Sequence, residues 1–332
     1  MVQTIIASAV IANGLRADFQ GTYTDIRNRQ ADGRVGMLMS NVGMTNRYQA
    51  FAYMGAAPHM ELWKPGDPVP SDAMDSTSFT GEVHNWARRI PWLKWDRKDD
   101  QLGVLYDAAK KTGESTGLLP ERFLFDLLNN ALTPITLPAT MLAPDGAAIF
   151  ATTAGGVARF GATNGNLLSG SGLATSSAVR TDYYSSIKQF GLFQDGKGQP
   201  LLSPETIGRG VLIIHALADT DIFEETFLQR RQGRVLGTDA GVSVSNVIQD
   251  ASRTIELWGS PRLATGDWYV ALKDSPTKPF ALLDREGVRE FEALEDNNNS
   301  DHVRNTGQEY VQWETRQGAV PALPYGIIKI NN

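Results

Sequence analysis

The stretch from Gly81 to Asn130 constrains the fold of this chain more than any other. Its first part, Gly81 to Trp95, interleaves aromatic and aliphatic residues with polar ones at a spacing of about two residues, which is typical of a strand. The pair Asp99-Asp100 can cap free backbone N–H groups, and leucines and alanines recur after it at helical spacing. We therefore predict an extended ribbon that turns into a helix at this pair. A ribbon with so many aromatic side chains needs a partner surface.

The residues before this ribbon predict a second extended limb. Aromatic and methionine residues cluster from Tyr48 to Gly66, and proline, glycine, aspartate and serine residues follow at 65–72. Two limbs with such a tip form a long hairpin, which is marginally stable alone and should lie on another surface. Apolar residues in the first 45 positions are spaced loosely, like a short amphipathic helix, and we interpret this region as an arm rather than a domain core.

Beyond the ribbon, the pattern predicts a mixed α+β chain. Gly113, Gly117 and Pro120 predict a kinked or split helical spine of about 30 residues, or about 45 Å. A glycine-rich loop region covers 145–172, and Asp221 with Glu224 has the form of a capping box at a helix start. Further helical periodicity runs from 176 to 193, and strands are predicted at 211–214, 255–257, 268–272, 280–283, 309–315 and 325–330.

Composition excludes several classes of protein. The chain has 332 residues, of which 42% are hydrophobic and 20% charged, and its 32 glycines and 16 prolines argue against a helical bundle. It has no cysteine, so disulfides, thiolate metal sites and cysteine nucleophiles are excluded. The net charge of −6 argues against tight binding to nucleic acid phosphates. No apolar run approaches the roughly 20 residues of a membrane span and no basic signal region is present, so we expect a soluble intracellular protein.

The candidate catalytic groups have simpler explanations. The four histidines do not have the spacing of a helical zinc site. His215 near Asp219 and Asp221 could form a metal or acid/base cluster, but acidic residues are also what a helix start favours. Ser-Gly-Ser-Gly at 169–172 matches neither a phosphate loop nor a nucleophile elbow. We therefore predict no catalytic, cofactor-binding or metal-binding residues.

Several short motifs follow one another along the chain. They are Asp99-Asp100-Gln101-Leu102-Gly103, Leu119-Pro120, Phe125-x-x-Leu128, Asp145-Gly146 with Phe150-Ala151-Thr152, Asn166 to Gly172, Trp268-Tyr269, Lys278-Pro279-Phe280, Arg285-Glu286-Gly287 and the tail from Tyr310 to Ile330. Their order resembles that of tailed-phage major capsid proteins, in particular the Mu-like major head subunit group. The resemblance departs from that group at about Ala154, where a histidine is common.

This resemblance implies an α+β chain with the Hong Kong 97 phage capsid fold. Its parts would be an N-terminal arm, an extended loop hairpin, a peripheral domain with a long spine helix, and an axial domain. The corresponding ranges are 1–49 for the arm, 50–97 for the extended loop, 98–200 for the peripheral domain with the spine helix and the start of the axial domain, 201–266 for a part that is mostly axial domain, and 267–332 for the return strands of both domains.

The resemblance also implies a function that is structural and not enzymatic. The chain would assemble with itself into pentamers and hexamers of an icosahedral shell, in the bacterial host cytoplasm, around double-stranded DNA that it binds non-specifically. A scaffold or scaffold-protease, a portal and decoration proteins would be its other partners, with no membrane involved. Candidate contacts between subunits are Trp63, Lys64, Trp86, Arg88, Arg89, Trp92 and Trp95.

Two alternatives remain open at this point. One is an encapsulin-like cellular compartment, which would have the same fold and hold protein cargo. The other is a soluble α+β hydrolase that uses His215 with Asp219 or Asp221.

Overall fold

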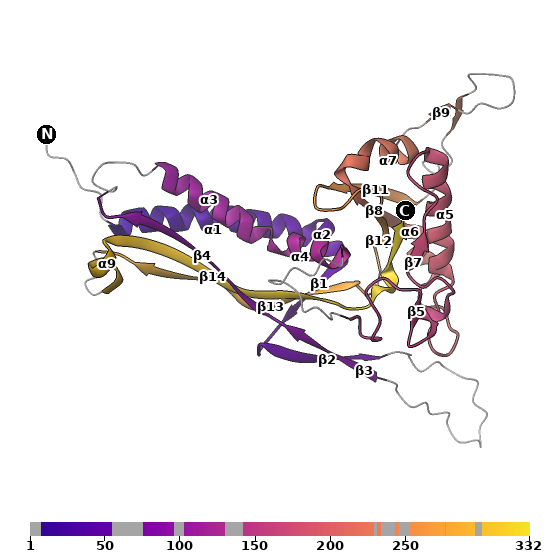
Figure 1. Cartoon of the computed structure of the whole chain (residues 1–332), viewed down its shortest axis with the longest axis horizontal. Coiled ribbons are helices and arrows are strands. Elements are labelled where there is room, and N and C mark those ends of the chain that lie inside the picture. The colour runs from indigo at the N-terminus through magenta and orange to yellow at the C-terminus, as the bar shows by residue number, and fades with distance from the viewer. Residues whose placement is uncertain are drawn as a thin grey trace, which may run out of the picture.

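The computed structural model has two lobes, an elongated one that contains the N-terminal helices and a second one that contains the C-terminus (Figure 1). In the elongated lobe, helices lie along one face of a long sheet with strand order β1-β13-β14-β4. The structure describes residues 8–54, 76–95, 103–129, 142–228, 231–233, 243–245, 253–275, 277–295 and 301–332.

The long sheet contains two strands from the first hundred residues of the chain and two from the last sixty. β13 and β14 are paired over most of their length, β4 is antiparallel to β14, and β1 is parallel to β13. β13 bulges between Asp284 and Arg289, where its register against β14 shifts. The strands are β1 (Met39–Gly43), β4 (His84–Leu93), β13 (Phe280–Ala293) and β14 (Gln308–Pro321).

Helix α1 (Ser8–Asp32) corrects the interpretation of the first residues as an arm. Ile11, Leu15 and Phe19 are buried at one-turn spacing, and Phe19 stacks on Trp313 of β14 with ring centroids 4.4 Å apart. These residues share a hydrophobic cluster with β4 and α3 (Gly103–Gly117), so α1 belongs to the core of the elongated lobe. Its apolar positions form one narrow stripe on an otherwise polar helix, which is why the pattern looked weak.

The predicted split of the spine is confirmed. Helix α3 ends at Gly117, and α4 (Leu119–Leu128) begins after one intervening residue with a proline in its first turn, where the missing N–H costs nothing. Two glycines let α3 approach α1 closely, because a Cβ at Gly113 would lie 2.6 Å from the carbonyl oxygen of Phe19. The short helix α2 (Arg34–Leu38) connects α1 to β1.

The predicted hairpin is present, but it ends earlier than the aromatic pattern suggested. β2 (Tyr48–Met54) pairs with β3 (Ser76–Glu82) in a two-stranded ribbon that projects from the elongated lobe (Figure 1). After Val83 the chain enters β4, which is a strand of the long sheet. The tryptophan-rich half of the ribbon therefore lies within the elongated lobe and not on the projecting hairpin.

The second lobe is built on a sheet with strand order β11-β8-β12-β15-β7. Every residue of β8 is buried, as the apolar run predicted, and its alternating side chains reach two different hydrophobic clusters. One cluster includes α4 and the start of β13 and so joins the lobes, while helices α5 and α7 contribute to the other. The strands are β7 (Leu167–Ser169), β8 (Gly210–Ala216), β11 (Thr254–Ser260), β12 (Trp268–Leu272) and β15 (Ile327–Asn331).

Helices and small elements complete this lobe. Helix α5 confirms the prediction for 176–193. The predicted capping box of Asp221 and Glu224 is wrong, because Asp221 lies inside the first turn of α7 and not before it. Helix α7 begins at Thr220, and the carboxylate of Asp219 accepts a hydrogen bond from the backbone N–H of Gly266 at 3.1 Å. The remaining elements are α5 (Ser176–Gly191), α6 (Pro204–Arg209), α7 (Thr220–Phe227), α9 (Asp301–Thr306), β5 (Thr153–Ala154), β6 (Val157–Ala158), β9 (Arg231–Gly233), β10 (Ser243–Ser245), η1 (Arg159–Gly161), η2 (Leu217–Asp219) and η3 (Pro324–Gly326).

Candidate functional site

The candidate contact residues are divided by the fold into different environments. Trp63 and Lys64 lie outside the described residues. Trp86, Arg88, Arg89 and Trp92 lie on β4, and Trp95 follows it. Because β4 is the edge strand of the long sheet, one of its backbone edges has no strand beside it in the described part of the chain.

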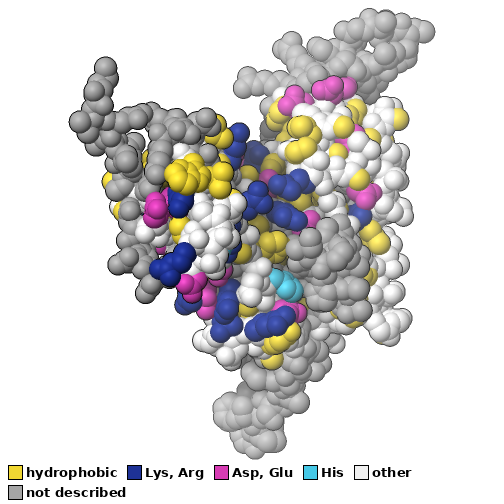
Figure 2. Space-filling view, turned by 60° about the vertical axis from the view of Figure 1, so that its left-hand side comes forward, with side chains coloured by type: hydrophobic (Ala, Val, Ile, Leu, Met, Phe, Trp, Pro, Cys, Tyr) yellow, Lys and Arg dark blue, Asp and Glu magenta, His cyan; other side chains and the backbone are white. Residues whose placement is uncertain are grey.

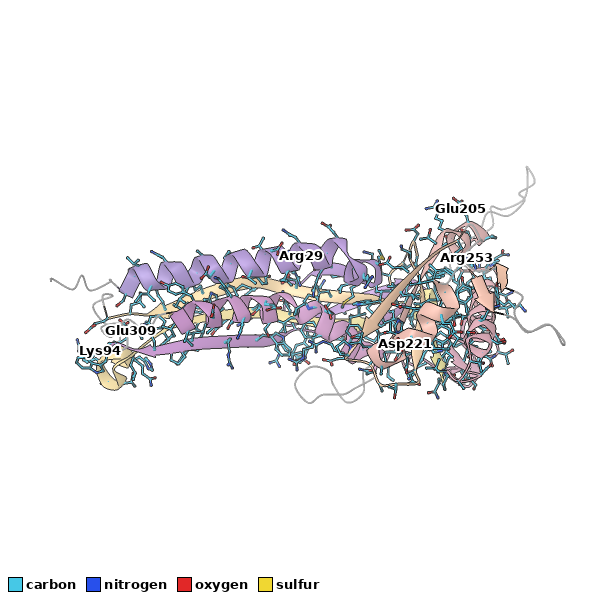
Figure 3. The ribbon with its side chains drawn as sticks, turned by 90° about the horizontal axis from the view of Figure 1, so that it is seen from above. Arg29, Lys94, Glu205, Asp221, Arg253 and Glu309 are labelled. Carbon is cyan, nitrogen blue, oxygen red and sulfur yellow. The ribbon has the colours of Figure 1, made fainter. Side chains whose placement is uncertain are left out.

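Trp92 is a core residue of its own subunit, which corrects its assignment as a contact with a neighbour. Its side chain is 3% exposed, and its Nε1 donates to the buried carboxylate of Glu309 at 2.7 Å. Glu309 also accepts from the hydroxyl of Ser8 at 2.7 Å and from the N–H of Glu295 at 2.8 Å. This carboxylate therefore joins the start of α1, β4 and the end of β13, at the far end of the elongated lobe (Figure 3).

Trp86 is half-buried and faces the helices. Its Nε1 donates to the carbonyl oxygen of Gln317 at 3.1 Å, and its ring packs on Phe123 of α4 at 5.4 Å. The guanidinium of Arg122 lies 5.7 Å from the centre of the same ring. Trp86 is therefore held by its own subunit but still lines a groove.

This groove, which we call the β4 groove, runs between β4 and the helices α3 and α4. One part of it, about 480 Å³, is lined by Trp86, Arg88, Lys111 and Arg122, among others. A second part of about 510 Å³ shares Lys111 and Arg122 and extends to Arg262 in the turn before β12. Figure 2 shows lysine and arginine side chains gathered along the hollow between the two lobes.

The charges of the β4 groove are unevenly matched. Arg122 pairs with Asp126, with 3.9 Å between Nε and Oδ2. Arg88, Lys111 and Arg262 form no ion pair with any residue that the structure describes. The groove thus offers free cations beside tryptophan, a combination that suits acidic and aromatic side chains. Sequence reasoning missed Lys111, Arg122 and Arg262, because they come from α3, α4 and the turn before β12, and no motif links them.

Arg89 and Trp95 lie elsewhere. Arg89 donates to the side-chain oxygen of Gln312, at 2.7 Å from Nη2, and its guanidinium lies 3.9 Å from the ring centre of Tyr310. Both partners are on β14. Arg88, the residue before Arg89 in β4, lines the groove beside the helices, so Arg89 lies on the opposite face of the sheet. Trp95 is 56% exposed at the far end of the elongated lobe, beside Lys94. Of the described candidates, Arg88, Arg89 and Trp95 have exposed side chains.

The geometry around His215 gives no support to a hydrolase. The ring is 1% exposed, stacks on Phe223 at 4.5 Å, and hydrogen-bonds through Nδ1 to the carbonyl oxygen of Ala216 at 2.8 Å. Burial lowers the pKa of His215, so the imidazole is neutral and packed. Across the described ranges, no group of three or more histidines and acidic residues is close enough to hold a metal ion. Also within those ranges, no helix combines the length and the apolar character needed to cross a bilayer.

A family model described as the Mu-like prophage major head subunit gpT matches residues 9–156. Over residues 9–156 the chain is thus similar to tailed-phage major head subunits, and it is called the capsid protein below. The match runs from α1 to the turn between β5 and β6, and so includes the hairpin, β4 and both spine helices of the capsid protein. A search of curated protein sequences found no match.

Solved particles share the fold of this capsid protein at low sequence identity. The mature capsid of bacteriophage PhiM1 is 8% identical with a TM-score of 0.56, covering 90% of this chain and 87% of that one. The capsid of the cyanophage P-SCSP1u is 10% identical with a TM-score of 0.53, covering 88% and 86%. A virus-like particle from Pyrococcus furiosus is 7% identical with a TM-score of 0.50, covering 94% and 96%. These likenesses show the Hong Kong 97 fold.

The fold alone does not distinguish a phage shell from an encapsulin-like compartment, because both have it. The family model does distinguish them, because it describes a phage head subunit. The capsid protein forms the shell of the phage particle, so its location is the virion. The compartment alternative is not favoured.

Proposed function

We propose that this capsid protein assembles as pentamers and hexamers into an icosahedral shell around double-stranded DNA. The projecting hairpin carries the proposal, because β2 and β3 pair with each other and with no further strand in the described chain. Such a ribbon gains stability from a second surface. A neighbouring copy supplies that surface, and this makes shell stability collective.

The β4 groove is the surface that we propose for this contact. The residues between β2 and β3, 55–75, include four acidic residues against one lysine, Lys64, and they also include Trp63. Arg88, Lys111 and Arg262 complement those acidic residues, and Trp86 lines the groove beside them. Arg89 and Trp95 are proposed as further contacts at the open face and at the far end of the sheet.

The proposed division of the subunit follows the two lobes. The elongated lobe corresponds to the peripheral domain, the second lobe to the axial domain, and the extended loop covers 50–97, although β4 within that range is part of the long sheet. Ranges 98–200 and 267–332 then contribute elements to both lobes, whereas β8 and β11 of range 201–266 belong to the sheet of the second lobe.

Other partners follow from what a phage shell requires. A net charge of −6 suits a shell that encloses DNA without binding its phosphates tightly, so DNA contacts would be non-specific. A separate scaffold or scaffold-protease, a portal and decoration proteins complete the proposed set. We propose no catalytic role for the capsid protein.

The test is electron microscopy of the purified protein by negative stain, with a charge reversal at the β4 groove. Wild-type protein should form closed particles, and Arg88→Glu should reduce their yield because it places an acidic side chain opposite an acidic loop. Arg209→Glu, on the exposed helix α6, is the matched control and should assemble normally. Wild-type protein that stays monomeric under all assembly conditions, with or without a scaffold, would refute the shell. Normal particles from Arg88→Glu would refute the groove contact.

A further inference from the structure

One long segment of the capsid protein presents a surface without charge. Residues 146–179 contain a single charged residue, Arg159, although a fifth of the whole chain is charged. The structure describes this segment completely, and Arg159 is only 1% exposed. Every side chain that this segment exposes to solvent is therefore uncharged.

The tip of this surface is the small hairpin β5–β6. The two strands turn at Gly155 and Gly156, whose φ angles of 57° and 82° are those of a tight turn that favours glycine. Val157 follows the turn and is 70% exposed, an unusual degree for a branched apolar side chain. Figure 1 places β5 at the end of the second lobe opposite β9.

Arg159 holds this hairpin from inside the lobe. Its guanidinium donates to both carboxylate oxygens of Asp145 at 2.7 and 3.0 Å, and to the carbonyl oxygens of Ala148 and Ile149 at 2.8 Å each. It also donates to the side-chain oxygen of Asn166 at 3.0 Å. Through one buried side chain, the segments before and after the hairpin are fixed to each other.

The next residue adds a second constraint. Phe160 has φ 54° and ψ 29°, and it is the one non-glycine with positive φ among the described residues. Its ring packs against Phe193 at 5.2 Å and Tyr325 at 6.1 Å, which offsets the strain of that conformation. The hairpin is therefore held in one shape by its own subunit, and preorganisation of this kind lowers the entropic cost of binding.

We infer that the β5–β6 tip is a contact between copies of the capsid protein, in which Val157 of one copy meets the same tip of another. Charged residues are depleted at the centre of protein interfaces. Where a surface meets itself around a symmetry axis, each side chain faces its like, and like charges repel, so a surface with no charge fits such a contact. DNA is a poor partner, because the tip has no cation for a phosphate. The inference rests on self-assembly of the chain, and it is separate from the β4 groove.

Crosslinking through one introduced cysteine tests the inference directly. The chain has no cysteine, so Val157→Cys contains a single thiol. In assembled particles, oxidation or a short bis-maleimide should join this variant into covalent dimers of the capsid protein. Val104→Cys is the matched control, because Val104 is 78% exposed at the start of α3 in the other lobe and should remain monomeric.

A charge at the tip gives an independent measurement. Val157→Asp should lose at least about tenfold in particle yield at equal protein concentration, since every copy would bring a negative charge to the same place. Val104→Asp should assemble like the wild type, because an acidic residue is favourable in the first turn of a helix. Normal assembly of Val157→Asp would overturn the inference. So would a Val157→Cys thiol that stays uncrosslinked in particles, or one that joins a different protein.

If the wild type fails to assemble, the outcome bears on the shell itself. The Val157→Cys crosslink can then be measured in whatever soluble oligomer forms, against Val104→Cys. A crosslink there supports the tip contact without the shell, and its absence overturns it.

Discussion

Replacing Arg159 by leucine should loosen one part of the second lobe strongly. Leucine has no donors, so Asp145 and two carbonyl oxygens lose their shared partner. Removing one member of a buried ion pair costs about 3–5 kcal/mol. The Asp145 side chain is 28% exposed and can regain water, and the carbonyl oxygen of Ile149 keeps a hydrogen bond from Asn166. The expected cost is therefore at the lower end, about 3 kcal/mol.

Hydrogen exchange measured by mass spectrometry on the unassembled protein resolves this effect locally, which suits a chain with two lobes that need not unfold together. A loss of about 3 kcal/mol should speed exchange of the amides in 143–166 by roughly a hundredfold, because every 1.4 kcal/mol is a factor of ten. Arg209→Leu is the control: it removes an arginine from a solvent-exposed pair with Glu205, and exposed pairs of this kind contribute little to stability. Equal exchange of 143–166 in the two variants would show that Arg159 does not hold the segment.

Three further predictions concern other parts of the subunit. Gly113→Ala should destabilise the capsid protein by about 1–3 kcal/mol in urea denaturation, because the added Cβ forces α3 away from α1. Gly21→Ala is the control and should stabilise the protein by about 0.5–1 kcal/mol, because a Cβ at Gly21 would have no atom within 4 Å. Equal effects of the two substitutions would contradict the close contact between the helices. Burial lowers the pKa of His215 in the folded protein from its ordinary 6.5. Below about pH 6.5 the unfolded chain therefore binds more protons than the folded protein, and the stability of the fold decreases as the pH decreases. His215→Leu should show a smaller drop in melting temperature between pH 7 and pH 5, and an unchanged drop would assign it to other groups. Trp92→Phe leaves an oxygen of the buried Glu309 without its donor and should cost about 2 kcal/mol in the same urea assay, against no loss if water replaces the indole.

Local patterns in the sequence predicted the elements well. The continuous apolar run at 211–214 became the buried strand β8, and the glycines and proline near 117–120 marked the break between α3 and α4. Such features depend on neighbours in the chain, which periodicity reports. The capping box of Asp221 and Glu224 failed because α7 begins at Thr220, which puts Asp221 inside the first turn of the helix. Asp219 precedes the helix, and its carboxylate accepts from the distant N–H of Gly266.

The candidate site was harder to predict, because it depends on pairings between distant residues. The tryptophans of β4 looked exposed, since nothing nearby in sequence covers them. Trp92 is covered by α1 and β14, and Trp86 packs on α4 and bonds to β14, whose residues are more than two hundred positions away. Trp92 meets Glu309 through the register of the β4–β14 pairing. Position 159 did carry a signal, a lone charge in a neutral run, but only the fold shows that it is buried.

The strand order β1-β13-β14-β4 has a consequence for synthesis of the capsid protein on the ribosome. The first helices emerge early, but the two central strands on which they pack, β13 and β14, are made last. Until residue 321 has left the ribosome, α1 and α3 have no complete sheet to cover, and their apolar faces stay open to chaperones. A chain that terminates before residue 280 therefore lacks both central strands of the long sheet, and its first helices have no sheet core on which to pack.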